Sequence, residues 1–281
     1  MKILEIENLK KRYTDFILDI DYLSLEEGFV MGLIGPNGAG KTTLLKCLMN
    51  LVVKDSGTIR IFGKKYDEHE QEIKSAMGFV HDEPDLWEEL TPLAIGKVTA
   101  GFYPEWDPSL YRRFLEGFQI PGEKKFKKLS RGMKMKCYLA AALSHNARLI
   151  LLDEPAAGLD PVARNEFLRI IADQLQDERK SFIISSHITS DLDKIADYVT
   201  LIKSGRIVLQ ESRNDLLDRF YICKGKLELL KNGANSLFVN IRKNEFGFEG
   251  LTEKIDEVRK NFGDSVVIER PNLEKLMIWY L

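Results

Sequence analysis

The chain alternates between short runs of apolar residues and longer stretches in which apolar positions recur at helical spacing. The apolar runs lie at residues 29–34, 149–152 and 181–185. Runs of this kind are typical of strands that are buried on both faces of a parallel sheet. Because helical stretches separate them, the pattern predicts an α/β fold with a parallel sheet at its centre.

The flanking segments predict further elements. Residues 2–8 and 16–25 alternate apolar and polar positions and predict two strands. Proline and glycine punctuate a mainly helical region from 91 to about 146. The other predicted strands lie at 58–62, 77–80, 198–203 and 206–210, and the other predicted helices at 41–50, 67–75, 162–177 and 212–219.

The last sixty residues form a separate pattern. Strands are predicted at 237–241 and 265–268, with a helix at 251–262 between them. A final amphipathic helix would start after Asn272 and turn Leu273, Leu276, Met277 and Tyr280 inward. We interpret residues 221–281 as a small α+β appendage whose simplest role is packing or support of a dimer.

A glycine-rich loop lies between the strand at 29–34 and the helix that starts near 41. Its sequence fits the pattern G-x-x-x-x-G-K-[ST], with Gly35, Gly40, Lys41 and Thr42 at the fixed positions. Such glycines let successive backbone N–H groups point at an anion, and the start of a helix adds further unpaired N–H groups. Lys41 would reach the β- and γ-phosphates of a nucleotide, and Thr42 would ligate Mg²⁺.

Three further polar clusters lie directly after predicted strands or at the start of a predicted helix. These positions suggest that they share one site with the loop. Asp153 and Glu154 come directly after a buried strand, where Asp153 would ligate Mg²⁺ and Glu154 would polarise a water. His187 follows the next buried strand, where it could bond a phosphate oxygen, although a lone histidine is more often structural. Ser130 would cap a helix whose N–H groups could bind an anion, but by composition alone a plain capped helix is the preferred interpretation.

Composition narrows the function classes. The 281 residues carry a net charge of −2, which gives no support for nucleic-acid binding. The three cysteines, Cys47, Cys137 and Cys223, form no metal-ligand or disulfide pattern, which favours a reducing compartment. No apolar run approaches the length needed to span a bilayer. Any membrane association is therefore expected to go through a partner.

Taken in order, these motifs resemble those of the ATP-binding subunits of ABC (ATP-binding cassette) transporters, in the style of bacterial single-cassette exporter subunits. The resemblance covers residues 1 to about 220. Its motifs are the aromatic Tyr13, the Walker A loop at 35–43, the Q-loop region at 78–90, the signature at 129–133, Walker B at 149–154, the D-loop at 157–160 with Asp160, and the H-loop at His187.

The resemblance implies a P-loop (RecA-like) core with a mainly parallel sheet and an N-terminal antiparallel β subdomain. A helical subdomain would be inserted at about 86–146, and the cassette of residues 1–220 would be followed by the accessory domain of 221–281. ATP and Mg²⁺ would be the cofactors, with Thr42 and Asp153 as metal ligands and Glu154 and His187 as catalytic residues. The implied ATP-binding residues are Tyr13, Gly35, Pro36, Asn37, Gly38, Ala39, Gly40, Lys41, Thr42 and Thr43.

The resemblance also implies two partners. The signature residues Ser130, Arg131, Gly132 and Met133 would close over the nucleotide of a second cassette, so hydrolysis would require a dimer. The helical region, rich in aromatics between 86 and 118, would form a groove for a helix of an integral membrane subunit. This partner would hold the chain at the cytoplasmic face of the membrane.

Two positions depart from the family pattern. Asp82 stands where the family has the Q-loop glutamine, which puts the coupling of this loop to the partner in doubt. The signature has Arg131 and Met133 where the family has glycine and glutamine, although Ser130 and Gly132 are kept.

Three functions follow from the sequence. The leading hypothesis is an ATPase that powers an exporter of lipid, peptide or antibiotic. A soluble family member in DNA repair or translation is the second, although no coiled-coil insert or second cassette is visible. A non-hydrolysing regulatory module is the third, and Glu154 with His187 argues against it.

Overall fold

The computed structural model describes residues 1–81, 87–230 and 234–280. Its contacts divide the chain into two compact units. The first comprises Met1–His187 with Ile195–Gln210, and the second comprises Ile188–Lys194 with Glu211–Leu281. The predicted division into domains at 1–220 and 221–281, with the helical subdomain at 86–146, stays a prediction.

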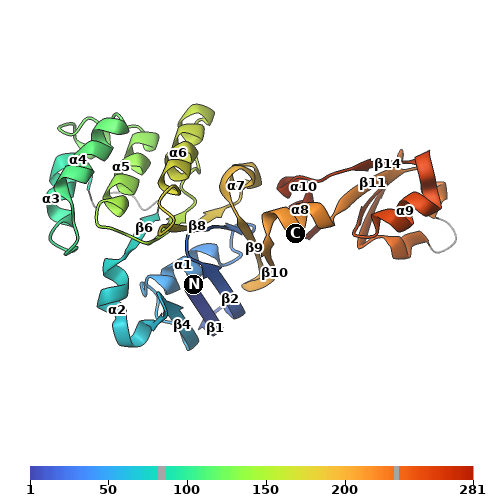
Figure 1. Cartoon of the computed structure of the whole chain (residues 1–281), viewed down its shortest axis with the longest axis horizontal. Coiled ribbons are helices and arrows are strands. Elements are labelled where there is room, and N and C mark those ends of the chain that lie inside the picture. The colour runs from blue at the N-terminus through green and yellow to red at the C-terminus, as the bar shows by residue number, and fades with distance from the viewer. Residues whose placement is uncertain (82–86, 231–233, 281) are drawn as a thin grey trace. The chain divides into compact units, whose positions relative to one another are not determined.

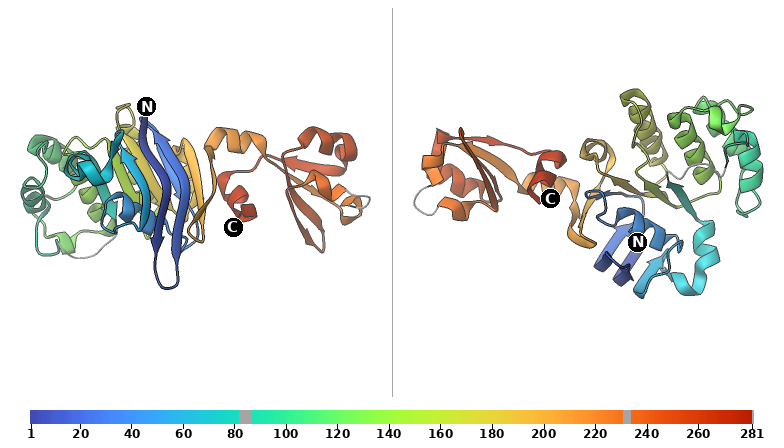
Figure 2. Two further views of the ribbon diagram at one scale, coloured as in Figure 1. Left: turned by 90° about the horizontal axis from the view of Figure 1, so that it is seen from below. Right: turned by 180° about the vertical axis from the view of Figure 1, so that it is seen from behind.

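The first unit begins with an antiparallel sheet of four strands in the order β2-β1-β4-β5 (Figures 1 and 2). One face of this sheet is apolar because alternate residues of β1, such as Leu4 and Ile6, point to the same side and are fully buried. Its strands are β1 (Lys2–Arg12), β2 (Ile17–Glu26), β4 (Ser56–Ile61) and β5 (Lys64–Lys65).

A second sheet of six strands has the order β10-β9-β3-β8-β7-β6. The pairs β3–β8, β3–β9, β6–β7 and β7–β8 are all parallel. Every residue of β3, β7 and β8 is buried, as the apolar runs predicted. The strands are β3 (Val30–Ile34), β6 (Met77–His81), β7 (Leu149–Asp153), β8 (Ser181–Ser186), β9 (Tyr198–Lys203) and β10 (Arg206–Ser212).

The core of this unit joins the two sheets around helix α1 (Lys41–Leu48). Leu44 and Leu48 of this helix belong to one buried cluster with residues of β1 and of the parallel strands. Two other helices of the unit are α2 (Tyr66–Ser75) and α6 (Pro161–Gln174). The α/β fold with a P-loop core and an N-terminal antiparallel sheet is therefore confirmed.

The helical region between β6 and β7 contains α3 (Pro92–Thr99), α4 (Pro108–Gly117) and α5 (Arg131–Leu143). These helices gather at one side of the unit (Figure 1). Thr91, Asp107 and Ser130 cap their N-termini by accepting hydrogen bonds from backbone N–H groups. Below, these three helices and the residues that join them are called the helical insert.

The second unit contains a four-stranded sheet in the order β12-β13-β11-β14. Its elements are α7 (Thr189–Ile195), α8 (Arg213–Arg219), β11 (Tyr221–Gly225), β12 (Asn240–Asn244), β13 (Gly247–Thr252), α9 (Ile255–Phe262), β14 (Val266–Glu269) and α10 (Leu273–Tyr280). An α+β appendage was predicted, but β11 and β13 were not. The predicted helix at 251–262 begins only at Ile255, because residues 251–252 complete β13.

Candidate functional site

The phosphate loop runs from the end of β3 to the start of α1 and has a backbone that only glycine adopts easily. Gly38 and Gly40 have φ angles of 77° and 109°. A Cβ atom on Gly40 would lie 2.8 Å from Cζ of Phe16, and one on Gly35 would lie 2.3 Å from the Ile202 carbonyl oxygen. At Gly35 the backbone therefore leaves no room for a side chain, and at Gly40 a side chain would have to displace Phe16 as well as adopt a strained backbone.

A cavity of about 600 Å³ opens over this loop. Glu154 comes to it from the end of β7, and Tyr13, Asp15 and Phe16 come from the segment between β1 and β2. Tyr13 is half-exposed, which leaves its ring accessible to a planar group. The cavity thus unites the sequence-predicted loop, aromatic and carboxylate. Its loop residues are Pro36, Asn37, Gly38, Ala39, Gly40, Lys41, Thr42 and Thr43.

Lys41 places a cation inside the loop. Its side chain is only 6% exposed, and its Nζ donates to the carbonyl oxygens of Gly35 at 2.7 Å and Pro36 at 3.3 Å. The same Nζ lies 3.1 Å from Oε1 of Glu154. A phosphate that entered the loop would meet this ammonium together with the N–H groups at the start of α1, which is a suitable environment for an anion.

Asp153 and Glu154 are held by one hydroxyl group that the sequence analysis did not single out. Oγ of Ser185, on the neighbouring strand β8, donates to Oδ1 of Asp153 at 2.6 Å. The same Oγ accepts the backbone N–H of Glu154 at 2.8 Å. Ser185 and Asp153 are paired across the two strands. The available signal was a serine that follows the apolar residues Phe182–Ile184 near the carboxyl end of the strand.

Glu154 lies between two cationic or hydrogen-bonding groups. Its Oε2 is 2.7 Å from Nδ1 of His187, and the His187 backbone N–H donates to the same oxygen at 3.3 Å. Because a carboxylate only accepts, Nδ1 of His187 carries a hydrogen in this arrangement. Glu154 also has a φ angle of 48°, which is uncommon for a residue other than glycine. The backbone is thus turned so that the carboxylate faces both Lys41 and His187.

The two predicted metal ligands offer the right type of atom for Mg²⁺. Thr42 lines the cavity with a hydroxyl, and Asp153 brings a carboxylate that is 7% exposed. Mg²⁺ prefers oxygen ligands and is commonly held by one or two protein groups together with phosphates and waters. Among the residues that the structure describes, no group of three or more His, Cys, Asp or Glu side chains could hold a metal by itself. The donor set therefore fits a metal that arrives with a nucleotide.

Comparison with known proteins decides the family. The ABC transporter family model matches residues 18–157 of the chain. The lantibiotic transport ATP-binding protein SrtF of Streptococcus pyogenes is 34% identical over 211 residues, covering 74% of this chain and 90% of SrtF. The chain belongs to the ABC transporter family. It is an ATP-binding subunit of that family and an ATPase.

Two further similarities extend this result. The bacitracin transport ATP-binding protein BcrA of Enterococcus faecalis is 28% identical over 282 residues, which cover 96% of this chain and 92% of BcrA. A solved structure described as the ATP-binding subunit of an ABC transporter has 26% identity and a TM-score of 0.68, covering 77% of this chain and 92% of that one. The similarity to BcrA thus includes the second unit.

The ABC signature lies outside the cavity just described. Ser130 caps α5 by accepting the N–H of Met133 at 3.2 Å. A Cβ atom on Gly132 would be 3.2 Å from Cβ of Ala163 in α6, so this helix start is closely packed. None of the described residues that line the nucleotide cavity comes from the signature, Ser130–Met133.

Of the departures from the family pattern, the structure describes Arg131 in the signature but not Asp82 of the Q-loop. Arg131 lies against the D-loop, because a Cβ atom on Gly158 would be 2.8 Å from its Nη1. Gly158 itself has a φ angle of 70°, which favours glycine at this position. The D-loop's Asp160 caps α6 by accepting from the N–H groups of Val162 and Ala163 at 2.9 and 3.0 Å. The predicted Q-loop position, Asp82, lies outside the described residues.

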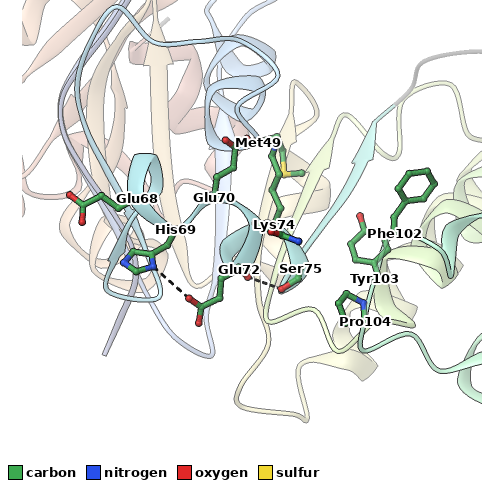
Figure 3. A pocket seen from close by; sticks show the side chains of 11 residues that line it. Met49, Glu68, His69, Glu70, Glu72, Lys74, Ser75, Phe102, Tyr103 and Pro104 are labelled. Carbon is green, nitrogen blue, oxygen red and sulfur yellow. Dashed lines mark hydrogen bonds and ion pairs between the residues drawn. The ribbon is translucent and has the colours of Figure 1, made fainter.

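A groove lies between α2 and the helical insert (Figure 3). It has a volume of about 860 Å³. Phe102, Tyr103 and Pro104 line one side, and residues of α2 line the other. Of the insert's aromatics, Tyr111 and Phe118 are buried in its core. Phe102 is exposed and Tyr103 is partly buried, so these two aromatics are available at the surface of the groove. No helix within the described part of the chain is long and apolar enough to cross a membrane.

Proposed function

We propose that this chain hydrolyses ATP as one half of a cassette dimer that powers an exporter in a membrane. One observation carries the proposal: a single cavity brings Lys41 of the phosphate loop together with Glu154, which also contacts His187. The relatives' names, which mention bacitracin and lantibiotic transport, favour an antibiotic or peptide as the exported molecule.

In this proposal each residue of the site has a role. Tyr13 stacks on the adenine ring, and the loop from Gly35 to Thr43 with Lys41 binds the phosphates. Thr42 and Asp153 hold Mg²⁺, which supplies charge neutralisation at the phosphates when bound. Glu154 accepts a proton from the attacking water, and His187 bonds the γ-phosphate. When a phosphate enters the loop, Lys41 exchanges its contact with Glu154 for the phosphate and leaves the carboxylate available to the water.

The signature supplies the other half of the site in a second copy or a second cassette. Ser130 and Gly132 would face the γ-phosphate bound by the partner cassette's loop, with Arg131 and Met133 beside them. ATP then stabilises the closed dimer, because it binds that state preferentially, and hydrolysis lets the dimer open. The groove of Figure 3 would receive a helix of the membrane subunit, which would keep the chain at the inner face of the membrane.

Substitution of Glu154 by Gln tests the catalytic assignment. The amide keeps the size of the side chain but cannot accept a proton, so turnover should fall at least about a hundredfold while nucleotide binding stays. The variant should accumulate as an ATP-bound dimer in size-exclusion chromatography with light scattering. The matched control is Glu178→Gln, which changes an exposed carboxylate. A Glu154→Gln variant that hydrolyses ATP at the wild-type rate would remove Glu154 from its role.

A pull-down from membranes tests the assembly. The tagged chain should retain a multi-spanning protein, and substitution of Phe102 and Tyr103 together by Glu should release it. Retention of only soluble proteins would contradict the transporter assignment of this chain.

A further inference from the structure

The segment that leads from the helical insert back to the core is tied to both. Residues 144–148 connect α5 to β7. The Ser144 carbonyl oxygen accepts from the backbone N–H of Asp107, in the insert, at 2.8 Å. The backbone N–H of Arg148 donates to the Ala76 carbonyl oxygen, in the core, at 2.9 Å. This return connection is therefore hydrogen-bonded to both the insert and the core, and its geometry depends on how the two are placed.

One side chain in this connection contacts both sides. His145 is 1% exposed, and its ring stacks on Tyr103 of the insert with centroids 3.8 Å apart and planes inclined by 20°. Nδ1 of His145 lies 3.2 Å from the carbonyl oxygen of Ser75, the last residue of α2. Because a carbonyl only accepts, Nδ1 carries the hydrogen. The imidazole thus joins the insert to the end of a core helix.

The two partners of His145 both line the groove of Figure 3. The connection that holds His145 is also the continuation of α5, whose other end carries the signature. With 13 residues, α5 spans about 20 Å at the usual rise of 1.5 Å per residue. A helix of this length transmits a tilt at its C-terminal end directly to Ser130 and Gly132.

We propose that His145 is a positioning residue for ATP turnover. By holding Tyr103 against the end of α2, it fixes the angle between the helical insert and the core, and through α5 it fixes where the signature sits. The inference rests on the proposed function, in which the signature completes the site of a partner cassette. The stacked pair of His145 and Tyr103 also lies at the groove, so a helix docked there would contact Tyr103.

Four variants of the full-length chain test this role in steady-state ATP hydrolysis. Tyr103→Ala and His145→Ala should lower kcat by about ten- to a hundredfold, because misplacement of a catalytic group by about 1 Å can cost about a hundredfold. The affinity for a fluorescent ATP analogue should stay unchanged, since neither residue lines the nucleotide cavity. Tyr103→Phe, which keeps the stacked ring, should retain kcat. Val98→Ala is the matched control, because Val98 lies in α3 of the same insert, is 42% exposed and lines neither the groove nor the nucleotide cavity.

His145→Phe separates the two contacts of the imidazole. The phenyl ring can stack on Tyr103 but cannot donate to Ser75, so kcat should fall less than in His145→Ala. Wild-type kcat in both alanine variants would overturn the proposal. An equal loss of kcat and of nucleotide affinity would also overturn it, because that pattern indicates general damage to the fold.

A measurement that needs no turnover distinguishes this proposal from the proposed function. Spin labels on Arg113→Cys of α4 and Asp173→Cys of α6 report the distance between insert and core, and the three native cysteines are buried. The wild-type background should give one narrow distance distribution, and Tyr103→Ala should broaden it. An unchanged distribution would overturn the role of the stack. A narrow wild-type distribution that Tyr103→Ala broadens, in a chain with no ATP turnover, would contradict the proposed function alone.

Discussion

The phosphate loop and the signature, which both bind phosphate in the proposed function, are built differently. At the phosphate loop, Lys41 and Asp153 are buried, and each has a partner within the chain. At the signature, Ser130 and Arg131 are exposed and lie outside the nucleotide cavity. The first is a pocket, whereas the second is a surface. We infer that one protomer holds a complete binding site for the nucleotide but only half of what hydrolysis requires.

Among the substitutions that test this difference, we expect the largest effect from a change at Ser185. Its hydroxyl bonds both the Asp153 carboxylate and the Glu154 backbone, so Ser185→Ala should displace the two acidic residues together. We expect turnover to fall about tenfold, as is common for residues that orient a catalytic group. The assay is ATP hydrolysis at saturating nucleotide.

Ser181→Ala is the control for this variant. Ser181 lies at the other end of the same strand, is equally buried, and accepts the Gly28 N–H instead. Its substitution should cost stability without a specific loss of turnover. Equal turnover losses in the two variants would mean that Ser185 has no special role at the site.

The sequence predicted those site residues whose signal lies within one short segment of the chain. The phosphate loop, Asp153, Glu154 and His187 were predicted because each follows a recognisable strand in the sequence. Ser185 was missed because its role arises from cross-strand pairing of β7 with β8, which no single segment encodes. Phe16 was missed for a similar reason: its contact with Gly40 joins distant parts of the chain.

The second unit was predicted less well than the first. The segment that forms β13 contains Gly247 and Gly250, which weaken a strand signal in the sequence. In the structure, the ring of Phe238 occupies the space where a Cβ atom of Gly250 would lie. The need for glycine there comes from tertiary packing, and the sequence analysis predicted no element for residues 247–250.

A smaller effect is expected at the D-loop. Asp160 and Asp107 cap α6 and α4 through two backbone hydrogen bonds each. Substitution of either by Ala should therefore lower the free energy of unfolding by about 1 kcal/mol. Denaturant titration measures this cost. If the D-loop also works across the dimer, Asp160→Ala alone should reduce turnover, and identical turnover in the two variants would limit Asp160 to capping.

The smallest expected effect concerns the stability of the helical insert in mild acid. Burial holds the pKa of His145 below its ordinary value of 6.5, because the charged imidazolium is disfavoured there. The unfolded chain therefore takes up a proton at a higher pH than the folded chain. The contribution of neutral His145 to stability is present above pH 6.5 and is lost as the pH falls through the folded-state pKa.

Denaturant titrations at pH 7.5 and 5.5 check this dependence. The loss of unfolding free energy between the two values should be smaller in His145→Phe than in the wild type. His69→Phe serves as the control, because His69 is exposed. A pH dependence that is the same in all three proteins would exclude His145 as a contributor.

The claim that one protomer carries only half of the hydrolytic site is tested most directly by mixing two inactive variants. Lys41→Ala removes the phosphate-loop cation, and Ser130→Arg blocks the signature. In an equal mixture, half of the dimers pair one of each and contain one intact composite site, so about a quarter of the wild-type ATPase rate should return. A mixture that stays as inactive as its two components would contradict the account.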